Sequence, residues 1–595
     1  MEDGIFNKNE QLFFERYGYH IEKSENENFF IDHAKNGKPI ICIKMGSRVL
    51  RMSSSYDPEY EADVWADQYF QKGRYLSMEI YGFGNVYYIR ALLKKALKDD
   101  LFLIEEENTQ FLSFIMQSFD ISDIITDERL FIHTPLDKKY TMREAVGMIM
   151  NMVGDPFFLA ITMRYYKESE EFLDCCRHLK SDYQVMNGFT YHMGRDAVLN
   201  SIYALSHADS NYCFSELIEK IPREMPVIIV AAGPSLLKNG ALLKKFHNKA
   251  FIICVDRAAG TIHKLGVTPD MISSVDPRKP LSMLKPEDAE GSYLLFDTSA
   301  NRKIQSKFQG RIFYATEGAV FAGAEAFKGK HFGCSIPGGT SVATWSAAIM
   351  ADHGFKTIIL VGQDMAAEGK ITHSDGAMEE LSNMKMVDGI NGGKVPSRDD
   401  WIRFINYYED WIVNQDNDIR LIDATEGGAL IHGSSVMKLE DVLTDICTEE
   451  YDIDGIFNGM HKALDKKGSE ETHKYIDELK NEAEQISDIM KRVERYASSV
   501  SKMFKYKTST EQDIEKKLVK IDKEIKDLHD IKYIDILLES ILKTRANVPT
   551  IDGRITDYDL GARELAKMSK YAAETIEGCA WLIDGIKKIE NDEEI

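Results

Sequence analysis

Short apolar runs recur through the middle of the chain, separated by segments with helical periodicity. Strands that are apolar along their whole length are typical of a parallel sheet covered by helices on both faces. The pattern predicts a doubly wound, Rossmann-like α/β domain over residues 187–449, with ligands at the carboxyl ends of its strands. The runs are Pro226–Gly233, Ala250–Asp256, Met271–Asp276, Ser292–Asp297, Arg311–Thr316, Lys356–Asp364 and Ile419–Thr425.

The N-terminal region, residues 1–186, mixes short β-like runs with helical patterns. Within Tyr75–Lys95 a strand-like run leads through Gly82 and Gly84 into an amphipathic helix, and Leu101–Asn108 follows as a second strand ending in acids. The pattern resembles half a nucleotide-binding fold, but a Gly-x-Gly turn also occurs in many βα units that bind nothing. We therefore predict an α/β domain in which this turn needs small residues for structural reasons.

Residues 450–595 carry few strand signals. Apolar residues at three- and four-residue intervals form a narrow seam along Ile476–Val500 and again along Ile514–Leu528, among many Lys and Glu. A final helix is predicted near Ala562–Lys587. Long helices with such a seam pack on one another, so this region is predicted to be an all-α hairpin or bundle.

Composition narrows the range of partners and compartments. The 595 residues include 73 Lys and Arg against 96 Asp and Glu, a net charge of −23, and duplex nucleic acid needs a basic footprint instead. The eight cysteines form no Cys-x-x-Cys pair, so we expect neither a disulfide framework nor a zinc site. With no signal-peptide pattern and no run of about 18 apolar residues, a cytoplasmic protein without a membrane span is expected.

The turn after the first strand of the middle domain is the first candidate ligand site. Gly233 would let a phosphate or sugar approach the backbone, and Pro234 suits the first turn of a helix. Ser235 can cap that helix or bind a ligand directly, and the helix N-terminus attracts anions. A serine-capped turn without any ligand explains this stretch equally well.

Small polar residues at the neighbouring strand ends favour a ligand. Acids after the second and third strands can bind a ribose or a base, and an adjacent arginine can bind a phosphate. A second glycine-hydroxyl loop, Gly338–Ser341, opens a later helix, and a polar loop follows the strand that ends at Asp364. The residues expected at one site are Gly233, Pro234, Ser235, Asp256, Arg257, Asp276, Gly339, Thr340, Ser341, Gln363, Asp364 and His373.

The order of these motifs, ending in Asp-Ala-Thr-Glu-Gly-Gly (Asp423–Gly428), resembles the motility-associated factor (Maf) family. These bacterial glycosyltransferases are implicated in flagellin glycosylation. The resemblance is close over the middle domain and reaches the first region through Ser54–Ala66. More distantly, the middle domain is similar to sialyltransferases that use CMP-sialic acid and to the MptE-like pterin diphosphokinase of archaea.

The resemblance implies that a nonulosonic acid, of the pseudaminic or legionaminic type, passes from a CMP-activated donor to Ser or Thr of flagellin. The donor would bind at the residues above, and the reaction would invert the anomeric centre without a metal or another cofactor. The helical region would bind the acceptor, and a homo-oligomer is compatible with the same helices.

Two side chains are candidates for the catalytic base. The sialyltransferases carry a catalytic histidine in the segment that corresponds to Gly392–Trp401, and this segment contains no histidine. His373, with an imidazole of roughly neutral pKa, or Asp364 would therefore take the proton. The Asp-x-Asp triplets 416–418 and 452–454 fall outside strand ends, so we expect polar turns there rather than metal ligands.

Two alternatives remain from the sequence. The same loops could hold ATP with magnesium in a pterin diphosphokinase-like enzyme, although such a kinase needs neither the long first region nor the helical tail. A non-enzymatic flagellin-binding scaffold could also retain a nucleotide fold. The nucleotide that the protein requires distinguishes all three.

Overall fold

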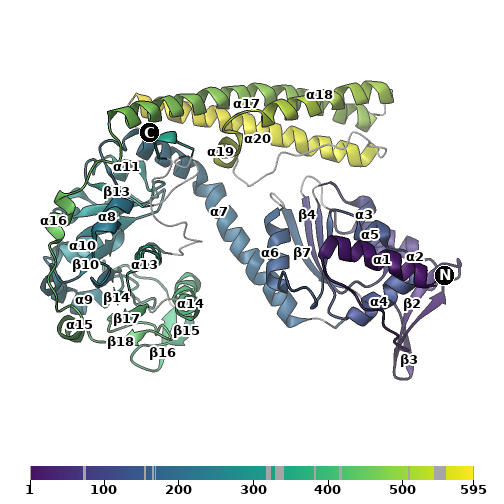
Figure 1. Ribbon diagram of the computed structural model, residues 1–595, viewed down its shortest axis with the longest axis horizontal. Helices are drawn as coiled ribbons and strands as arrows, with labels where there is room; N and C mark the ends of the chain where they lie inside the picture. Colours follow the sequence, from purple (N-terminus) through teal and green to yellow (C-terminus); the bar gives the residue numbers. More distant parts are fainter. Residues whose placement is uncertain are drawn as a thin grey trace. The chain divides into compact units, whose positions relative to one another are not determined.

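The computed structural model describes residues 2–70, 75–98, 100–152, 156–163, 166–167, 169–315, 320, 323–327, 341–380, 384–414, 419–506, 510–541, 558–591 and 593. The chain divides into two compact units (Figure 1). Unit 1 comprises Met1–His192 and Glu482–Ile583, and unit 2 comprises Met193–Asn481 and Asp584–Ile595. The predicted α/β class, with parallel sheets and a helical C-terminal region, is confirmed.

Unit 1 contains a four-stranded parallel sheet in the order β6-β5-β4-β7. Its strands are β4 (Tyr75–Tyr81), β5 (Leu101–Glu105), β6 (Leu130–His133) and β7 (Pro156–Thr162). The chain winds from β4 towards β6 on one side and places β7 on the other side. A three-stranded antiparallel sheet precedes it, made of β1 (Phe29–His33), β2 (Pro39–Met45) and β3 (Arg48–Arg51).

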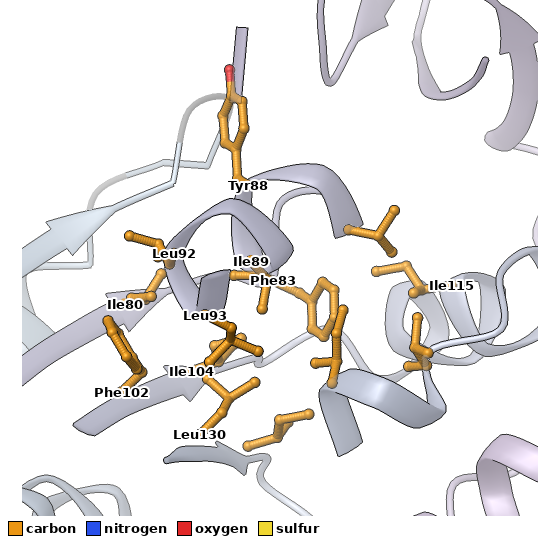
Figure 2. Close-up of a cluster of buried hydrophobic side chains, with 14 of the residues drawn as sticks. Ile80, Phe83, Tyr88, Ile89, Leu92, Leu93, Phe102, Ile104, Ile115 and Leu130 are labelled. Atoms are coloured by element: carbon orange, nitrogen blue, oxygen red, sulfur yellow. The ribbon is translucent and has the colours of Figure 1, made fainter. Parts of the chain in front are cut away.

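Helix α3 (Val86–Lys95) follows the Gly82–Gly84 turn and carries much of the unit 1 core. Asn85 caps it, because its side chain accepts hydrogen bonds from the amides of Tyr87 and Tyr88. The helix lies on the sheet, where Figure 2 shows a continuous apolar cluster. The labelled members are Ile80, Phe83, Tyr88, Ile89, Leu92, Leu93, Phe102, Ile104, Ile115 and Leu130.

Unit 2 is built on a nine-stranded parallel sheet in the order β18-β17-β14-β9-β10-β11-β12-β13-β8. All seven apolar runs predicted as strands are strands of this sheet, and short edge strands complete it. The strands are β8 (Tyr212–Cys213), β9 (Val227–Val230), β10 (Phe251–Val255), β11 (Met271–Ser274), β12 (Tyr293–Phe296), β13 (Ile312–Tyr314), β14 (Thr357–Val361), β17 (Arg420–Asp423) and β18 (Ser435–Val436).

The strand order of unit 2 reverses between β9 and β14. From β9 the chain winds through β10 to β13 in one direction, whereas β14, β17 and β18 extend the sheet in the other. Helices α10 (Asp256–Lys264) and α13 (Val342–Asp352) pack on the central strands. Ligands of open α/β sheets bind where the order reverses, at the carboxyl ends of the strands. A ligand is therefore expected at the carboxyl ends of β9 and β14.

Long helices form the C-terminal region predicted from the apolar seams. Helices α17 (Lys466–Tyr506), α18 (Glu511–His529) and α20 (Tyr558–Glu590) run alongside one another (Figure 1). Within unit 1, Arg492 of α17 pairs with Glu524 of α18 at 2.9 Å. Three helices, α7 (Glu170–Ser206), α17 and α20, contribute residues to both units. None of the helices in the described ranges combines the length and apolarity that a bilayer crossing requires.

The remaining elements connect these layers. They are α1 (Glu2–Tyr17), α2 (Pro58–Asp67), α4 (Thr109–Ser118), α5 (Ser122–Ile125), α6 (Met142–Met152), α8 (Phe214–Lys220), α9 (Leu236–Asn239), α11 (Arg302–Gln305), α14 (Asp399–Asn414), α15 (Leu439–Asp445), α16 (Ile453–Asn458), α19 (Ile534–Ile541), a β15 (Lys385–Asp388) and β16 (Lys394–Ser397) hairpin, and the 3₁₀ turns η1 (Gly240–Phe246), η2 (Leu281–Met283), η3 (Pro286–Ala289) and η4 (Glu325–Phe327).

Candidate functional site

A cavity of about 240 Å³ opens at the reversal point of the unit 2 sheet. The ends of β9, β10 and β14 form its floor, while the start of α13, the loop after β14 and the start of α14 form its walls. Its lining comprises Ala231, Ala232, Gly233, Val255, Asp256, Arg257, Lys279, Ser341, Val342, Ala343, Gly362, Gln363, Asp364, Met365, Thr372, His373, Arg398, Trp401 and Phe404.

Most of the residues predicted from the sequence meet at this cavity. Those in its lining are Gly233, Asp256, Arg257, Ser341, Gln363, Asp364 and His373. Those that do not line it are Pro234, Ser235 and Asp276. Gly339 and Thr340 lie outside the described residues.

Ser235 is fully buried, and both of its donors contact Asp364. The Ser235 hydroxyl donates to Asp364 Oδ2 at 2.7 Å, and the Ser235 amide donates to Oδ1 at 3.1 Å. Burial raises the pKa of Asp364 to about 6, against the opposing effect of the Ser235 hydrogen bonds. The turn after β9 therefore already holds an anion, the carboxylate of Asp364.

A second carboxylate, Asp256, lies at the end of β10 and is 1% exposed. Its oxygens are 3.0 Å from Lys279 Nζ and 2.7 Å from the donating hydroxyl of Ser274. The Arg257 amide also donates to it at 2.7 Å. The two hydrogen bonds fix the Asp256 carboxylate, and its ion pair then holds Lys279 at the cavity wall.

His373 lies in the loop after β14 and lines the cavity. Its Nδ1 is 3.1 Å from the hydroxyl of Thr372, and its ring meets Trp401 edge-on with centroids 5.9 Å apart. Burial, followed by the positive charge of Arg257, lowers the pKa of His373 to about 4, below the roughly neutral value expected from the sequence. The imidazole is therefore neutral at physiological pH and can accept a proton.

Three comparisons relate this chain to known proteins. Residues 200–370 match the family model described as 6-hydroxymethylpterin diphosphokinase MptE-like. An uncharacterized protein of Treponema pallidum (strain Nichols) is 25% identical over 167 residues, which are 27% of this chain and 76% of that protein. The structure of a Maf glycosyltransferase from Magnetospirillum magneticum AMB-1 is similar over 99% of this chain and 95% of the other, with a TM-score of 0.60 and 13% identity. This chain has the Maf fold.

In this Maf fold, three cationic side chains line the cavity. Arg257 pairs with Asp375 at 3.1 Å, and Lys279 pairs with Asp256. Arg398, the residue before α14, pairs with Glu379 and with Asp400, the latter at 2.8 Å, and lies 4.1 Å from the ring centroid of Trp401. Each of these cations has an acidic partner, so an anionic ligand would share the cation with that partner or replace it.

Sequence reasoning missed Lys279, Arg398, Trp401 and Phe404 as lining residues. Arg398 and Trp401 belong to Gly392–Trp401, the segment in which the sialyltransferase resemblance expects a histidine. Instead of a histidine, this segment provides Trp401, whose ring contacts that of His373 from another loop. Arg398 of the same segment lies over the Trp401 ring. The signal available was an Arg and a Trp three residues apart within this segment.

Gln363 provides the cavity with an unused acceptor. Its amide donates to the Thr425 hydroxyl at 3.2 Å, which fixes the backbone. Its side chain is 6% exposed, and within the described part of the chain its Oε1 accepts no hydrogen bond. A buried acceptor without a donor is costly, so a ligand hydroxyl or amino group has a favourable place there.

The acids of the cavity are already engaged by hydrogen-bond donors. Asp256 and Asp364 both accept from serines, and the described residues contain no group of three or more His, Cys, Asp or Glu arranged for a metal. Of the two Asp-x-Asp triplets, residues 416–418 lie outside the described ranges. Asp452 caps α16, where it accepts from the Gly455 amide at 2.9 Å.

Proposed function

We propose that this protein is a glycosyltransferase that moves a nonulosonic acid from a CMP-activated donor to Ser or Thr of flagellin. The observation that carries the proposal is the cavity at the sheet reversal, which is lined by neutral His373 and by three cationic side chains. The Maf fold supports a transferase, since a protein of that fold is described as a glycosyltransferase. The sugar would be of the pseudaminic or legionaminic type.

The donor would bind through charge and through fixed polar groups. Its phosphate and the carboxylate of its sugar are anions, which Arg257, Lys279 and Arg398 would attract. The unused oxygen of Gln363 would accept from a hydroxyl or an amino group of the donor. Ser341, at the cap of α13, adds a hydroxyl and the N-terminus of an eleven-residue helix.

The reaction would be an inverting single displacement. His373 would take the proton of the acceptor hydroxyl while that oxygen forms a bond to the anomeric carbon. The bond from this carbon to the phosphate oxygen would break, and CMP would leave with the electron pair. The cations would stabilise the negative charge that develops on the phosphate, so the step needs no metal. Asp364, whose pKa is raised to about 6, is the other candidate for the base.

Nucleotide titration tests this function directly. We expect calorimetry to detect CMP binding in the presence of EDTA. Arg257→Met should weaken it about tenfold or more, because a hydrogen bond to a charged group contributes about 1.5–3 kcal/mol. Arg278→Met is the matched control, since Arg278 also pairs with one aspartate but lies outside the cavity lining.

Other outcomes would support the alternatives. A response to ATP with magnesium but not to CMP would favour the pterin diphosphokinase-like enzyme, and no nucleotide binding at all would favour a scaffold. In cells that lack the protein, the mass spectrum of flagellin should lose sugar masses while the polypeptide mass is unchanged.

A further inference from the structure

Two separate loops of unit 2 close around Asp364. A Cβ atom added to Gly233 would lie 1.9 Å from Asp364 Oδ2, and one added to Gly428 would lie 2.2 Å from the Asp364 carbonyl oxygen. Gly427 approaches Oδ1 from the same side as Gly428. The turn after β9 and the loop after β17 therefore both need glycine, because Asp364 occupies the space that a side chain would fill.

Asp364 is fixed through its main chain as well as its carboxylate. Its carbonyl accepts from the Ala429 amide at 2.7 Å, and the following residue, Met365, has a positive φ of 45°. A non-glycine residue in this conformation is strained, and such strain persists only where the surroundings impose it. With both oxygens accepting from Ser235, the carboxylate is built into the turn and is 4% exposed.

The turn that Asp364 holds also carries the His373 loop. The Gly233 amide donates to the Gly362 carbonyl at 2.7 Å, which ties the turn to the end of β14. One residue earlier, the Ala232 carbonyl accepts from the Ser374 amide at 2.8 Å, and the Ser374 hydroxyl is 3.1 Å from that of Thr261. A continuous set of hydrogen bonds therefore links Asp364 to the residue next to His373.

The glycine turn of unit 1 has the same arrangement. There the Phe83 amide, between Gly82 and Gly84, donates to Glu106 Oε2 at 2.9 Å. Glu106 follows β5, is fully buried, and accepts also from the Tyr166 hydroxyl at 2.7 Å. In both sheets, a carboxylate from a neighbouring strand end fills the position in which a βα turn could hold a phosphate. The unit 1 turn thus has a structural reason for its small residues.

We propose that Asp364 is a positioning residue that fills the anion position of the Gly233–Ser235 turn and, through this turn, holds the His373 loop against the cavity. The proposal rests on the transferase function proposed above. The carboxylate is 4% exposed and both of its oxygens accept from Ser235, which fits an anchor of the turn better than a base that must meet the acceptor hydroxyl. The donor phosphate is then held by the cations of the cavity rather than by this turn.

The substitution Asp364→Asn separates positioning from proton transfer. Its carboxamide can accept from the Ser235 amide and donate to the Ser235 hydroxyl, but it cannot act as a base. We expect single-turnover transfer to fall by less than about tenfold, the equivalent of one weakened hydrogen bond, with the decline of the rate towards pH 4 unchanged. Asp270→Asn is the matched control, because Asp270 is also a carboxylate that accepts from a backbone amide, that of Ile252 at 2.7 Å, but lies just before the start of β11.

The substitution Asp364→Ala removes the anchor, so CMP affinity and transfer should fall together. Adding Ser235→Ala should then cause no further loss in either quantity or in the thermal midpoint, because the two side chains act as one unit. A loss of 100-fold or more in Asp364→Asn, with wild-type CMP affinity, would overturn the proposal and make Asp364 the base.

A wild-type protein without CMP binding or transfer would contradict the proposed function and not the anchor. In that case the thermal midpoints decide. If the double variant Asp364→Ala/Ser235→Ala loses less thermal stability than the sum of the two single variants, the anchor is supported. If the losses in thermal midpoint are fully additive, the anchor is overturned.

Discussion

His373 is the side chain whose chemistry depends most on its surroundings. Above its pKa the imidazole is neutral and can take a proton, and protonation as the pH falls removes the base. Burial and Arg257 hold this pKa at about 4 rather than near the usual 6.5. The ligand-free site therefore keeps an available base across the whole range in which histidine normally titrates.

The pH dependence of kcat/KM reports this property, because it reflects groups of the free enzyme. In Asp364→Asn, which cannot titrate at this position, we expect kcat/KM to stay constant as the pH falls from 8 to about 5 and to decline only towards pH 4. His373→Ala should lower the rate by about 10²–10⁴ and leave CMP affinity nearly unchanged. An acid limb centred near 6.5, or an alanine variant with the wild-type rate, would assign the base elsewhere.

The contacts of single residues could be predicted from the sequence only in part. The sequence indicated that Ser235 would cap its helix or contact a ligand, but the structure shows its hydroxyl donating to Asp364, far along the chain. Arg398 and Trp401 were not predicted at the site, because their position depends on where α14 begins and how it packs. Local pattern identifies the residue types at strand ends, while long-range packing decides their partners.

At the scale of elements, the apolar runs of unit 2 were sufficient to predict its seven main strands. A strand buried on both faces must be apolar throughout, so its signal is strong in a short window. The helix predicted after Ser235 is shorter than expected, since α9 spans only Leu236–Asn239 and continues as the 3₁₀ turn η1. The β15–β16 hairpin was not predicted, because its exposed strands lack a continuous apolar run.

The loop after β17 provides a test at the same scale. Gly428 has a φ of +80°, and an added Cβ would collide with backbone atoms of Asp364, which cannot rotate away. Gly428→Ala should therefore lower both the free energy of unfolding and CMP affinity. Gly310→Ala is the control, since Gly310 has a φ of +87° and open space around it. It should cost only the backbone strain, about 1–2 kcal/mol.

Thermal unfolding and CMP titration of the two variants give the comparison. Equal losses of stability, with CMP affinity intact in both, would show that the close approach of Gly428 to Asp364 contributes nothing beyond its backbone conformation.

For the whole molecule, the C-terminal helices raise the question of what they bind. We predict that they bind the acceptor. The compact units suggest where to cut, because unit 2 retains residues up to Asn481 and Asp584–Ile595. Lys480 Nζ and Glu590 Oε1 are 2.6 Å apart, so the two segments lie side by side. A short Gly-Ser linker can therefore join Asn481 to Asp584 after Glu482–Ile583 is excised.

This excised protein should bind CMP as the full chain does and bind flagellin more weakly. Calorimetry with CMP and surface plasmon resonance with purified flagellin give the two affinities. Unchanged flagellin binding in a folded, CMP-binding protein would assign the helices another role, such as self-association.

The division of α7, α17 and α20 between the two units has a consequence for synthesis on the ribosome. Unit 1 requires Glu482–Ile583, and unit 2 requires Asp584–Ile595, so neither unit has all its residues when its first half has emerged. At about 5–20 residues per second, the interval between Met193 and Asp584 lasts roughly 20–80 s. During this interval each unit lacks the C-terminal helix residues that belong to it, which makes the chain a client for chaperones that shield apolar surface until translation has passed residue 584.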